Sequence, residues 1–272
     1  MPDGVTAPVG AGDPCLDEVK AELQSRPEFE KIVGKALRQA FDEVIDCPRT
    51  GRYRIEDLEK TEKTYIGTKV EIVLRQKLEL ARGAKLDNII RGHEVDTKFS
   101  LTGGWMIPRE AVGEICLLVQ GSDKLGVFSV GVLRTRMDVL TRGQNQDKKR
   151  SVSGSGKRLI SWVCRDKKLP LNFLLSLDDN TRAAILSQGS ATQRLRALFR
   201  NVTGQIIPRS VIPQVAQVPG DPFKRARETK KVLGSEGFQV LCAKYQADSA
   251  EFKRHGFSGF EKDDWLSIRV GA

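Results

Sequence analysis

A continuously apolar stretch, Ile115-Cys116-Leu117-Leu118-Val119, constrains the fold more than any other part of the chain. A strand with one face in water alternates apolar and polar residues, whereas a strand that is covered on both faces does not. We therefore expect this stretch to be a central strand of a sheet that is covered on both sides. Further strand candidates flank it at 87–90, 93–100 and 127–136, and Arg91-Gly92 is a plausible tight turn between the first two.

Apolar residues at helical spacing predict helices on either side of these strands in the sequence. The predicted ranges are 16–23, 32–46 and 64–80 before the strands and 158–166 after them, with a short helix at 55–58 and Gly83 closing the 64–80 helix. Helices followed by a mixed sheet with helices packed on it indicate an α/β or α+β core.

The length of 272 residues gives room for two ordinary domains, and Lys168-Leu169-Pro170 marks a candidate boundary between them. Residues 1–14 are rich in Gly, Pro, Ala and Asp, so we expect a disordered leader there. The first domain is expected at 15–166 and the second at 167–272.

The second domain has the element order of a winged helix-turn-helix. Helices are predicted at 172–177, 182–187, 191–202, 206–216 and 222–233, and short strands at 239–245 and 265–270. Asp221 and Pro222 suit the N-cap and the first position of the last helix. The last three of these helices, followed by the two strands, have the order of three helices and a β-ribbon that is found in winged-helix DNA-binding domains.

The formal net charge of +10 favours a polyanionic partner such as DNA. Residues 141–168 contain nine basic and two acidic residues, and residues 191–231 contain nine basic residues against Asp221 and Glu228. The candidate DNA-binding residues are Lys148, Lys149, Arg150, Arg194, Arg209, Lys224, Arg225, Arg227 and Lys230. A solvated basic surface without a partner is the alternative interpretation.

The number and spacing of the cysteines and histidines limit the kinds of metal site and catalytic site that the chain can form. The five cysteines never form a Cys-x-x-Cys pair, which argues against a disulfide framework and a zinc ribbon and is typical of reduced cysteines. With two histidines in the chain, a multi-histidine metal centre or a Ser/His/Asp triad is poorly supported, so carboxylates and lysine must carry any chemistry. No signal segment and no run of about 18 apolar residues is found, so we expect a cytoplasmic protein.

The strand candidate at 93–100 carries a possible catalytic site. Because side chains alternate along a strand, Asp96 and Lys98 point to one face, while Thr97 turns its side chain away and leaves its carbonyl at the rim. Asp87, and Glu71 at the edge of the apolar stripe of the 64–80 helix, are expected to reach the same point. Carboxylate and carbonyl oxygens are the ligands that Mg²⁺ prefers.

These residues predict a Mg²⁺ site for the hydrolysis of phosphodiesters. The expected metal ligands are Asp87, Asp96, the Thr97 carbonyl and Glu71, and the expected catalytic residues are Glu71, Asp87, Asp96 and Lys98. Lys98 would orient the attacking water and offset the charge on the phosphorane.

Each assignment has a structural alternative. The face with Asp96 and Lys98 can be a solvated strand face, Glu71 can be a half-buried charge paired with Lys69 or Arg75, and Asp87 can be a turn cap. Thr102-Gly103-Gly104 is either a mobile loop near the cut phosphate or a plain connection.

Three segments carry a resemblance to a known family. They are Lys60-Thr61-Glu62-Lys63-Thr64-Tyr65-Ile66-Gly67-Thr68-Lys69-Val70-Glu71, Gly92-His93-Glu94-Val95-Asp96-Thr97-Lys98-Phe99-Ser100 and Trp105-Met106-Ile107-Pro108. Together they resemble the NaeI family of type II restriction endonucleases, and the similarity extends over most of residues 30–270. The active-site carboxylates of that family fall on Glu71, Asp87 and Asp96, and its lysine falls on Lys98.

The resemblance implies a nuclease domain of the PD-(D/E)XK class followed by a winged-helix DNA-binding domain, acting with Mg²⁺ as a homodimer on double-stranded DNA. It also implies that both domains can bind DNA, one copy being cut and the other acting as an effector. Three functions stay open: a sequence-specific endonuclease, a winged-helix DNA-binding protein that does not cut, and a nuclease that depends on base modification or nicks at a repair signal.

Overall fold

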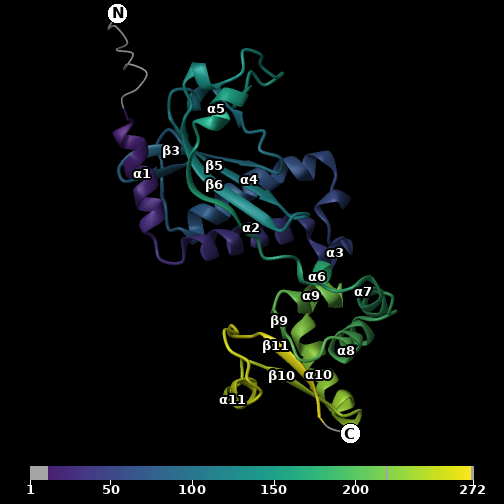
Figure 1. The fold of residues 1–272 in the computed structure, drawn as a ribbon. Coiled ribbons are helices and arrows are strands. Elements are labelled where there is room, and N and C mark those ends of the chain that lie inside the picture. Colours follow the sequence, from purple (N-terminus) through teal and green to yellow (C-terminus); the bar gives the residue numbers. More distant parts are fainter. Residues whose placement is uncertain (1–11, 219, 271–272) are drawn as a thin grey trace, which may run out of the picture. The chain divides into compact units, whose positions relative to one another are not determined.

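The computed structural model describes residues 12–218 and 220–270 (Figure 1). The chain divides into two compact units, Met1–Val44 with Glu59–Pro170 and Ile45–Leu58 with Leu171–Ala272. Residues 45–58 thus belong to the second unit, which the expected division between residues 166 and 167 did not anticipate.

The predicted leader at 1–14 falls mostly outside the described residues. Its last residues start the first helix, α1 (Pro14–Ser25). The Asp13 carboxylate accepts a hydrogen bond from Leu16 N at 3.1 Å and two more from the Arg134 guanidinium at 2.7 and 3.0 Å. Asp13 is therefore an ordered helix cap.

A six-stranded mixed sheet forms the centre of the first unit. In spatial order its strands are β1 (Ala81–Arg82), β2 (Asn88–Ile90), β3 (His93–Ser100), β5 (Ile115–Ser122), β6 (Val127–Arg134) and β8 (Ser161–Lys168). β3 and β5 pair in parallel, and the other neighbours are antiparallel. The central position predicted for the apolar stretch at 115–119 is confirmed, because β5 is an interior strand and all five side chains are buried.

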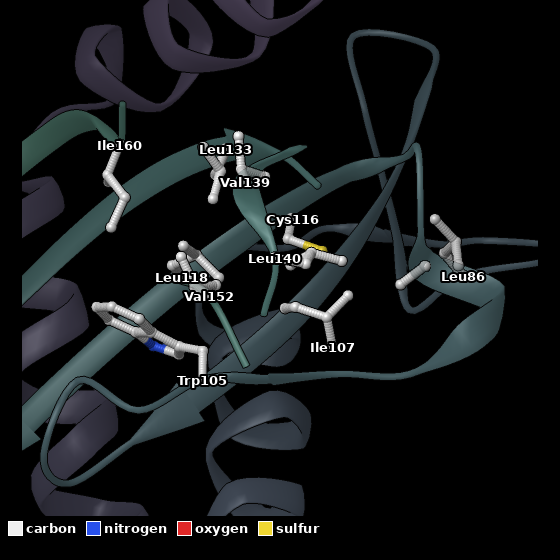
Figure 2. Packing of buried hydrophobic residues seen from close by; sticks show 11 residues of the cluster. Leu86, Trp105, Ile107, Cys116, Leu118, Leu133, Val139, Leu140, Val152 and Ile160 are labelled. Carbon is white, nitrogen blue, oxygen red and sulfur yellow. The ribbon is translucent and has the colours of Figure 1, made fainter. Parts of the chain in front are cut away.

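The two faces of the sheet have different covers. On one face, the Phe41 ring of α2 (Phe29–Ile45) lies 5.7 Å from the Phe99 ring of β3. On the other face, Cys116 and Leu118 of β5 pack in a cluster that includes Trp105 (Figure 2). Because Lys98 alternates with Phe99 along β3, the Lys98 side chain lies on the face with the cluster.

The remaining elements of the first unit are short. They are β4 (Met106–Ile107), η2 (Arg109–Ala111), η3 (Met137–Val139), β7 (Arg150–Ser151) and α5 (Gly154–Arg158), and β4 pairs with β7.

Helix α4 (Lys60–Lys77) supplies the long helix that was predicted at 64–80. It begins four residues earlier because Glu59 and Glu62 form a capping box, in which Glu59 N donates to Glu62 Oε2 at 2.8 Å. It ends at Lys77 rather than near Gly83, and Glu79 then turns the chain with a φ of 50°.

The helix predicted at 158–166 is wrong, because most of this segment is the strand β8. Trp162, Val163 and Cys164 are followed by the four charged residues 165–168, and β8 pairs with β6 at the edge of the sheet. Charged residues such as Arg165 and Lys167 are common on edge strands, where they oppose pairing with other chains. The residues of β6 that pair with β8 lie about 30 to 40 positions earlier in the chain, so local spacing could not reveal the pairing.

The second unit combines short helices with a three-stranded antiparallel sheet of order β10-β11-β9. Its elements are α3 (Cys47–Thr50), η1 (Ile55–Asp57), α6 (Phe173–Ser176), α7 (Asp179–Leu186), α8 (Ala191–Asn201), β9 (Ile206–Ile207), α9 (Val211–Ala216), α10 (Pro222–Ser235), β10 (Phe238–Cys242), α11 (Gln246–Arg254) and β11 (Trp265–Arg269). The Phe199 and Trp265 rings, 5.6 Å apart, join α8 to β11 in its core.

Two predictions for this unit need correction. The helix expected at 206–216, with an interruption at Pro213, is a strand, β9, followed by the helix α9. The break falls at Pro208, which cannot continue a helical hydrogen-bond pattern, whereas Pro213 lies in the first turn of α9. Helix α11, between β10 and β11, was not expected. Among the described helices, none combines the length and the apolar character that a membrane span needs.

A buried ion pair anchors α2 to the turn between β5 and β6. Arg38 Nη1 lies 2.6 Å from Asp123 Oδ1, and the two side chains are 10% and 3% exposed. Arg38 Nη2 also lies 2.8 Å from Asp42 Oδ1. We expect Arg38→Ala to lower the free energy of unfolding by about 3–5 kcal/mol, because it leaves the Asp123 carboxylate buried without its cation.

Urea unfolding of Arg38→Ala, Asp123→Ala and the double variant measures this effect. The double variant should lose clearly less stability than the sum of the two single variants. Additive losses would show that the two charges do not stabilise one another.

Candidate active site

Three carboxylates surround the ammonium group of Lys98. Lys98 Nζ lies 2.8 Å from Asp96 Oδ2, 3.7 Å from Asp87 Oδ2 and 3.8 Å from Glu71 Oε1. Lys98 and Asp96 lie on β3, Asp87 lies just before β2, and Glu71 lies on α4. Figure 1 labels β3 and α4. The structure thus brings together the four side chains that the sequence selected as catalytic candidates.

Alternation along β3 gives each of its residues a separate contact. Asp96 and Lys98 share one face, whereas the Thr97 hydroxyl turns away and accepts a hydrogen bond from Asn88 Nδ2 at 2.8 Å. Thr97 N donates to Asp87 Oδ2 at 2.8 Å, and the Thr97 carbonyl accepts from Lys98 Nζ at 3.0 Å. The Thr97 carbonyl is therefore beside the carboxylates, as expected.

The contacts argue against two of the structural alternatives. Asp96 is 4% exposed, so its face of β3 is not solvated. The two basic neighbours of Glu71 have other partners, since Lys69 pairs with Glu43 at 2.8 Å and Arg75 Nη1 donates to the Asp87 carbonyl at 3.1 Å.

Burial dominates the electrostatics of the cluster. Loss of solvent raises the pKa of Glu71 to about 7, and the nearby Asp87 and Asp96 carboxylates add to the rise although Lys98 opposes it. Burial also raises the pKa of Asp96 to about 6. For Lys98, burial lowers the pKa but the carboxylates, led by Asp96, outweigh it, so the pKa is raised and the ammonium stays charged.

Glu94 fixes the loop that carries Asp87, a role that the sequence pattern did not reveal. Its carboxylate accepts hydrogen bonds from the backbone nitrogens of Ala84, Lys85 and Leu86 at 2.8, 3.2 and 2.8 Å. A Cβ on Gly83 would overlap the backbone carbonyl oxygen of Leu86 as well as Glu94 Oε2, so the chain needs glycine there. The signal available in the sequence was a glycine eleven residues before an acidic strand residue, which is too common to be informative.

Two polar side chains, Cys116 and Thr135, lie next to Asp96 on the face of the sheet that the apolar cluster covers. Cys116 Sγ lies 3.8 Å from Asp96 Oδ2 and 3.7 Å from Thr135 Oγ1. Burial raises the pKa of the Cys116 thiol, so the thiol keeps its proton and can donate it to the Asp96 carboxylate. Cys116 was not a candidate in the sequence, because its contact depends on the register between β3 and β5.

The described residues contain no group of three or more His, Cys, Asp or Glu side chains arranged to hold a metal ion. Asp96, Asp87 and Glu71 instead face the Lys98 ammonium. Their oxygens and the Thr97 carbonyl are nevertheless of the chemical type that hard divalent cations bind.

The basic candidates near the first sheet lie in the segment that follows η3. Lys148 is exposed, and Lys149 is half-buried with its backbone nitrogen bonded to Asn145 Oδ1 at 2.8 Å. Arg150 Nη1 donates to the carbonyls of Thr141 and Arg142. Arg150 therefore holds its loop, whereas the Lys148 side chain is exposed to solvent.

The basic candidates in the second unit fall into two groups. Arg194 donates to the carbonyls of Gln188, Val215 and Ala216 at 2.6–2.9 Å, so its guanidinium holds the ends of neighbouring helices. Lys230 pairs with Asp248 at 2.7 Å, and Arg209 pairs with Asp263 and stacks on the Phe223 ring.

Lys224 and Arg225, in contrast, are exposed on the first turn of α10. Arg227 lies nearby, with Nη2 at 3.6 Å from Asp221 Oδ2. Asp221 caps this helix as predicted, since its carboxylate accepts from the nitrogens of Phe223 and Lys224. The N-terminal turn of α10 thus presents two exposed cations on a capped helix.

Comparison with known proteins gives two findings. The family described as "Restriction endonuclease NaeI" matches residues 18–272 of this chain. The chain is also 36% identical over 241 residues to the type II restriction enzyme NaeI of Lentzea aerocolonigenes, a match that covers 84% of this chain and 75% of that protein.

Because Glu71 is buried, we expect its charged carboxylate to lower the free energy of unfolding of the metal-free protein above neutral pH. The raised pKa means that the charged carboxylate is disfavoured in the folded protein, by about 1–3 kcal/mol above about pH 7. We expect Glu71→Gln to be more stable than the wild type at about pH 8 with a chelator present. The advantage should shrink as the pH falls through about 7 towards 4.5, where the wild-type carboxylate takes up its proton in the folded state first.

Thermal unfolding of both proteins over this pH range measures the difference. A Gln variant that is less stable than the wild type at high pH, or a difference that does not vary with pH, would contradict the assigned electrostatics.

Proposed function

Because the chain belongs to the NaeI restriction endonuclease family, we propose that it is a Mg²⁺-dependent endonuclease that hydrolyses phosphodiester bonds of double-stranded DNA at a specific sequence. The observation that carries the proposal is the Lys98 ammonium within 3.8 Å of three carboxylates. A helix glutamate, a loop aspartate and the Asp-x-Lys of a central strand make up the site of the PD-(D/E)XK class, to which we assign the first unit.

The chemistry of the donor set fits Mg²⁺. Asp87, Asp96, Glu71 and the Thr97 carbonyl would hold the ion, since all four offer oxygen ligands. Type II restriction endonucleases in general use divalent metal ions. Such an ion supplies Lewis-acid polarisation of the phosphate and lowers the pKa of water.

The side chains of the protein have their own parts in the reaction. The Lys98 ammonium would orient the attacking water and offset the negative charge that develops on the phosphorane, in a position set by its 2.8 Å contact with Asp96. Hydrogen bonds from Thr97 N to Asp87 and from Lys98 to the Thr97 carbonyl hold the oxygens in place before substrate arrives. Glu71, on a different element, would bind a further water or ion.

We assign the second unit to DNA binding as a winged helix-turn-helix. In support, helices α8, α9 and α10 pack with the three-stranded sheet β10-β11-β9, and α10 presents Lys224 and Arg225 at its N-terminal end. The N-terminal residues of a recognition helix are the ones that reach base edges. The candidate contacts are Lys224, Arg225 and Arg227, with Lys148 in the first unit.

A homodimer is the expected working form. Two antiparallel DNA strands present their scissile bonds in opposite directions, and a two-fold symmetric pair of Lys98 clusters matches that symmetry. The complete carboxylate cluster argues against a DNA-binding protein that does not cut. Digestion of methylated and unmethylated plasmid in parallel separates an ordinary restriction activity from one that depends on base modification.

We expect Lys98→Ala, and separately Asp96→Ala, to lower plasmid cleavage in Mg²⁺ by about 100-fold or more, because each removes a group that acts on charge in the transition state. Binding of DNA without metal should change little. Gel analysis of plasmid cleavage over time gives the rates. Lys85→Ala is a matched control, since Lys85 pairs with Glu114 at 2.6 Å outside the cluster. Full cutting by Lys98→Ala would remove Lys98 from the mechanism.

We expect Lys224→Ala/Arg225→Ala to weaken DNA binding and to lower the slope of log K against log salt by about 1–2, because two exposed cations near phosphates are lost. Binding is measured in Ca²⁺ in place of Mg²⁺ over a range of salt. Lys230→Ala serves as a comparison, because Lys230 already pairs with Asp248 and its loss should reduce stability more than the salt slope. Equal slopes for the wild type and the double variant would mean that α10 faces solvent in the complex.

A further inference from the structure

A polar pocket, separate from the carboxylate cluster, opens on the face of the sheet that carries Lys98. Its volume is about 500 Å³. The residues that give it its character are Gly103, Gln120, Lys157, Arg158, Trp162 and Arg165. None of them belongs to the carboxylate cluster.

Strand register places this pocket beside the carboxylate cluster around Lys98. Lys98 on β3 is opposite Leu118 on β5, and Gln120 lies two residues further along β5 on the same face. Two residues of a strand span about 7 Å, at about 3.3 Å per residue. Trp105 and Ile160, which line the pocket, pack in the same cluster of buried apolar side chains as Leu118 (Figure 2).

The pocket has an excess of positive charge. Lys157 and Arg158, at the end of α5, are exposed, and neither side chain forms an ion pair with any described residue. Asp166, the acidic residue of the lining, has a partner in Arg165, whose Nε lies 3.5 Å from Asp166 Oδ2. Lys157 and Arg158 therefore remain available for an anion.

An ordered loop forms one wall of the pocket. Ser100 Oγ accepts hydrogen bonds from Thr102 N at 3.2 Å and from Gly104 N at 2.9 Å. Gly103 between them has a φ of 75°, and a Cβ there would lie 3.0 Å from Gln120 Oε1. The loop is therefore held against the Gln120 amide in a conformation that favours glycine.

We propose that this pocket binds a backbone phosphate of the DNA strand being cut, close along that strand to the phosphate at Lys98. A DNA strand presents a regular series of phosphates, so a pocket that lies two residues further along the sheet than Lys98 is within reach of a neighbouring phosphate. Lys157 and Arg158 supply the charge, and the Gln120 amide supplies a neutral hydrogen-bond donor. The inference rests on the proposed function for the phosphate at Lys98, but binding in the pocket can be measured without cleavage.

The first test removes the two free cations. Lys157→Ala/Arg158→Ala is compared with Lys20→Ala/Arg91→Ala, which removes one lysine and one arginine outside the pocket lining. Affinity for plasmid DNA is measured in Ca²⁺ over a range of salt. We expect the pocket variant to bind about ten-fold more weakly than the control variant, with a salt slope lower by about 1–2. Equal affinity and slope for the two variants would overturn the proposal.

The second test uses tryptophan fluorescence to identify the anion. Trp162 is half-buried in the pocket lining, whereas Trp105 and Trp265 are 2% and 1% exposed. DNA should change the emission of the wild type, and Trp162→Phe should lose most of this change. A stronger response to inorganic phosphate than to duplex DNA at equal phosphate concentration would indicate a site for free anions and would contradict a DNA contact.

Cleavage assays separate this inference from the proposed function. If the wild type cuts plasmid in Mg²⁺ and the pocket variant binds like its control, the pocket inference fails alone. If the wild type does not cut but the pocket variant loses binding, the proposed catalysis fails and the pocket remains a DNA-binding site. Circular dichroism and thermal unfolding of both double variants confirm that the comparison is between folded proteins.

Discussion

The parallel pairing of β3 with β5 determines where the charges of this protein lie. It sets Asp96 beside Cys116 and Lys98 beside Leu118, in the interior of the sheet. Since the β5 stretch is apolar, the carboxylate of Asp96 is desolvated, and its pKa rises to about 6. A shift of one residue would turn Asp96 and Lys98 towards α2 and bring Thr97 to the site. The chemistry, the two polar side chains next to Asp96 and the neighbouring pocket all depend on this one register.

Much of the first unit follows from local patterns. Alternation and apolar content alone predict the bounds of β3, the shared face of Asp96 and Lys98, and the buried position of the 115–119 stretch. The place of Glu71 at the edge of the α4 stripe comes from helical spacing. The strand β8 could not be predicted, because its partner β6 is distant in the sequence. The anchoring of the Asp87 loop by Glu94 could not be predicted either, because it depends on how the loop folds back onto β3.

The basic residues of the second unit show the same limit of sequence-based prediction. The cap of α10 was predictable, since Asp221 and the nitrogens it bonds are adjacent in the chain. Arg194 and Lys230 looked equivalent to Lys224 in the sequence, yet their charges are used inside the unit. Composition therefore predicts how many cations a segment has, and only tertiary contacts decide which of them can meet DNA.

We propose that this chain cuts double-stranded DNA at a defined sequence with a divalent metal ion. The most direct measurement is to incubate the purified wild-type protein with plasmid DNA in Mg²⁺ and in a chelator, and to sequence the ends of the products. The account predicts discrete fragments in Mg²⁺ alone, with one shared sequence at every cut. No cleavage, cleavage that persists in the chelator, or ends of random sequence would contradict it.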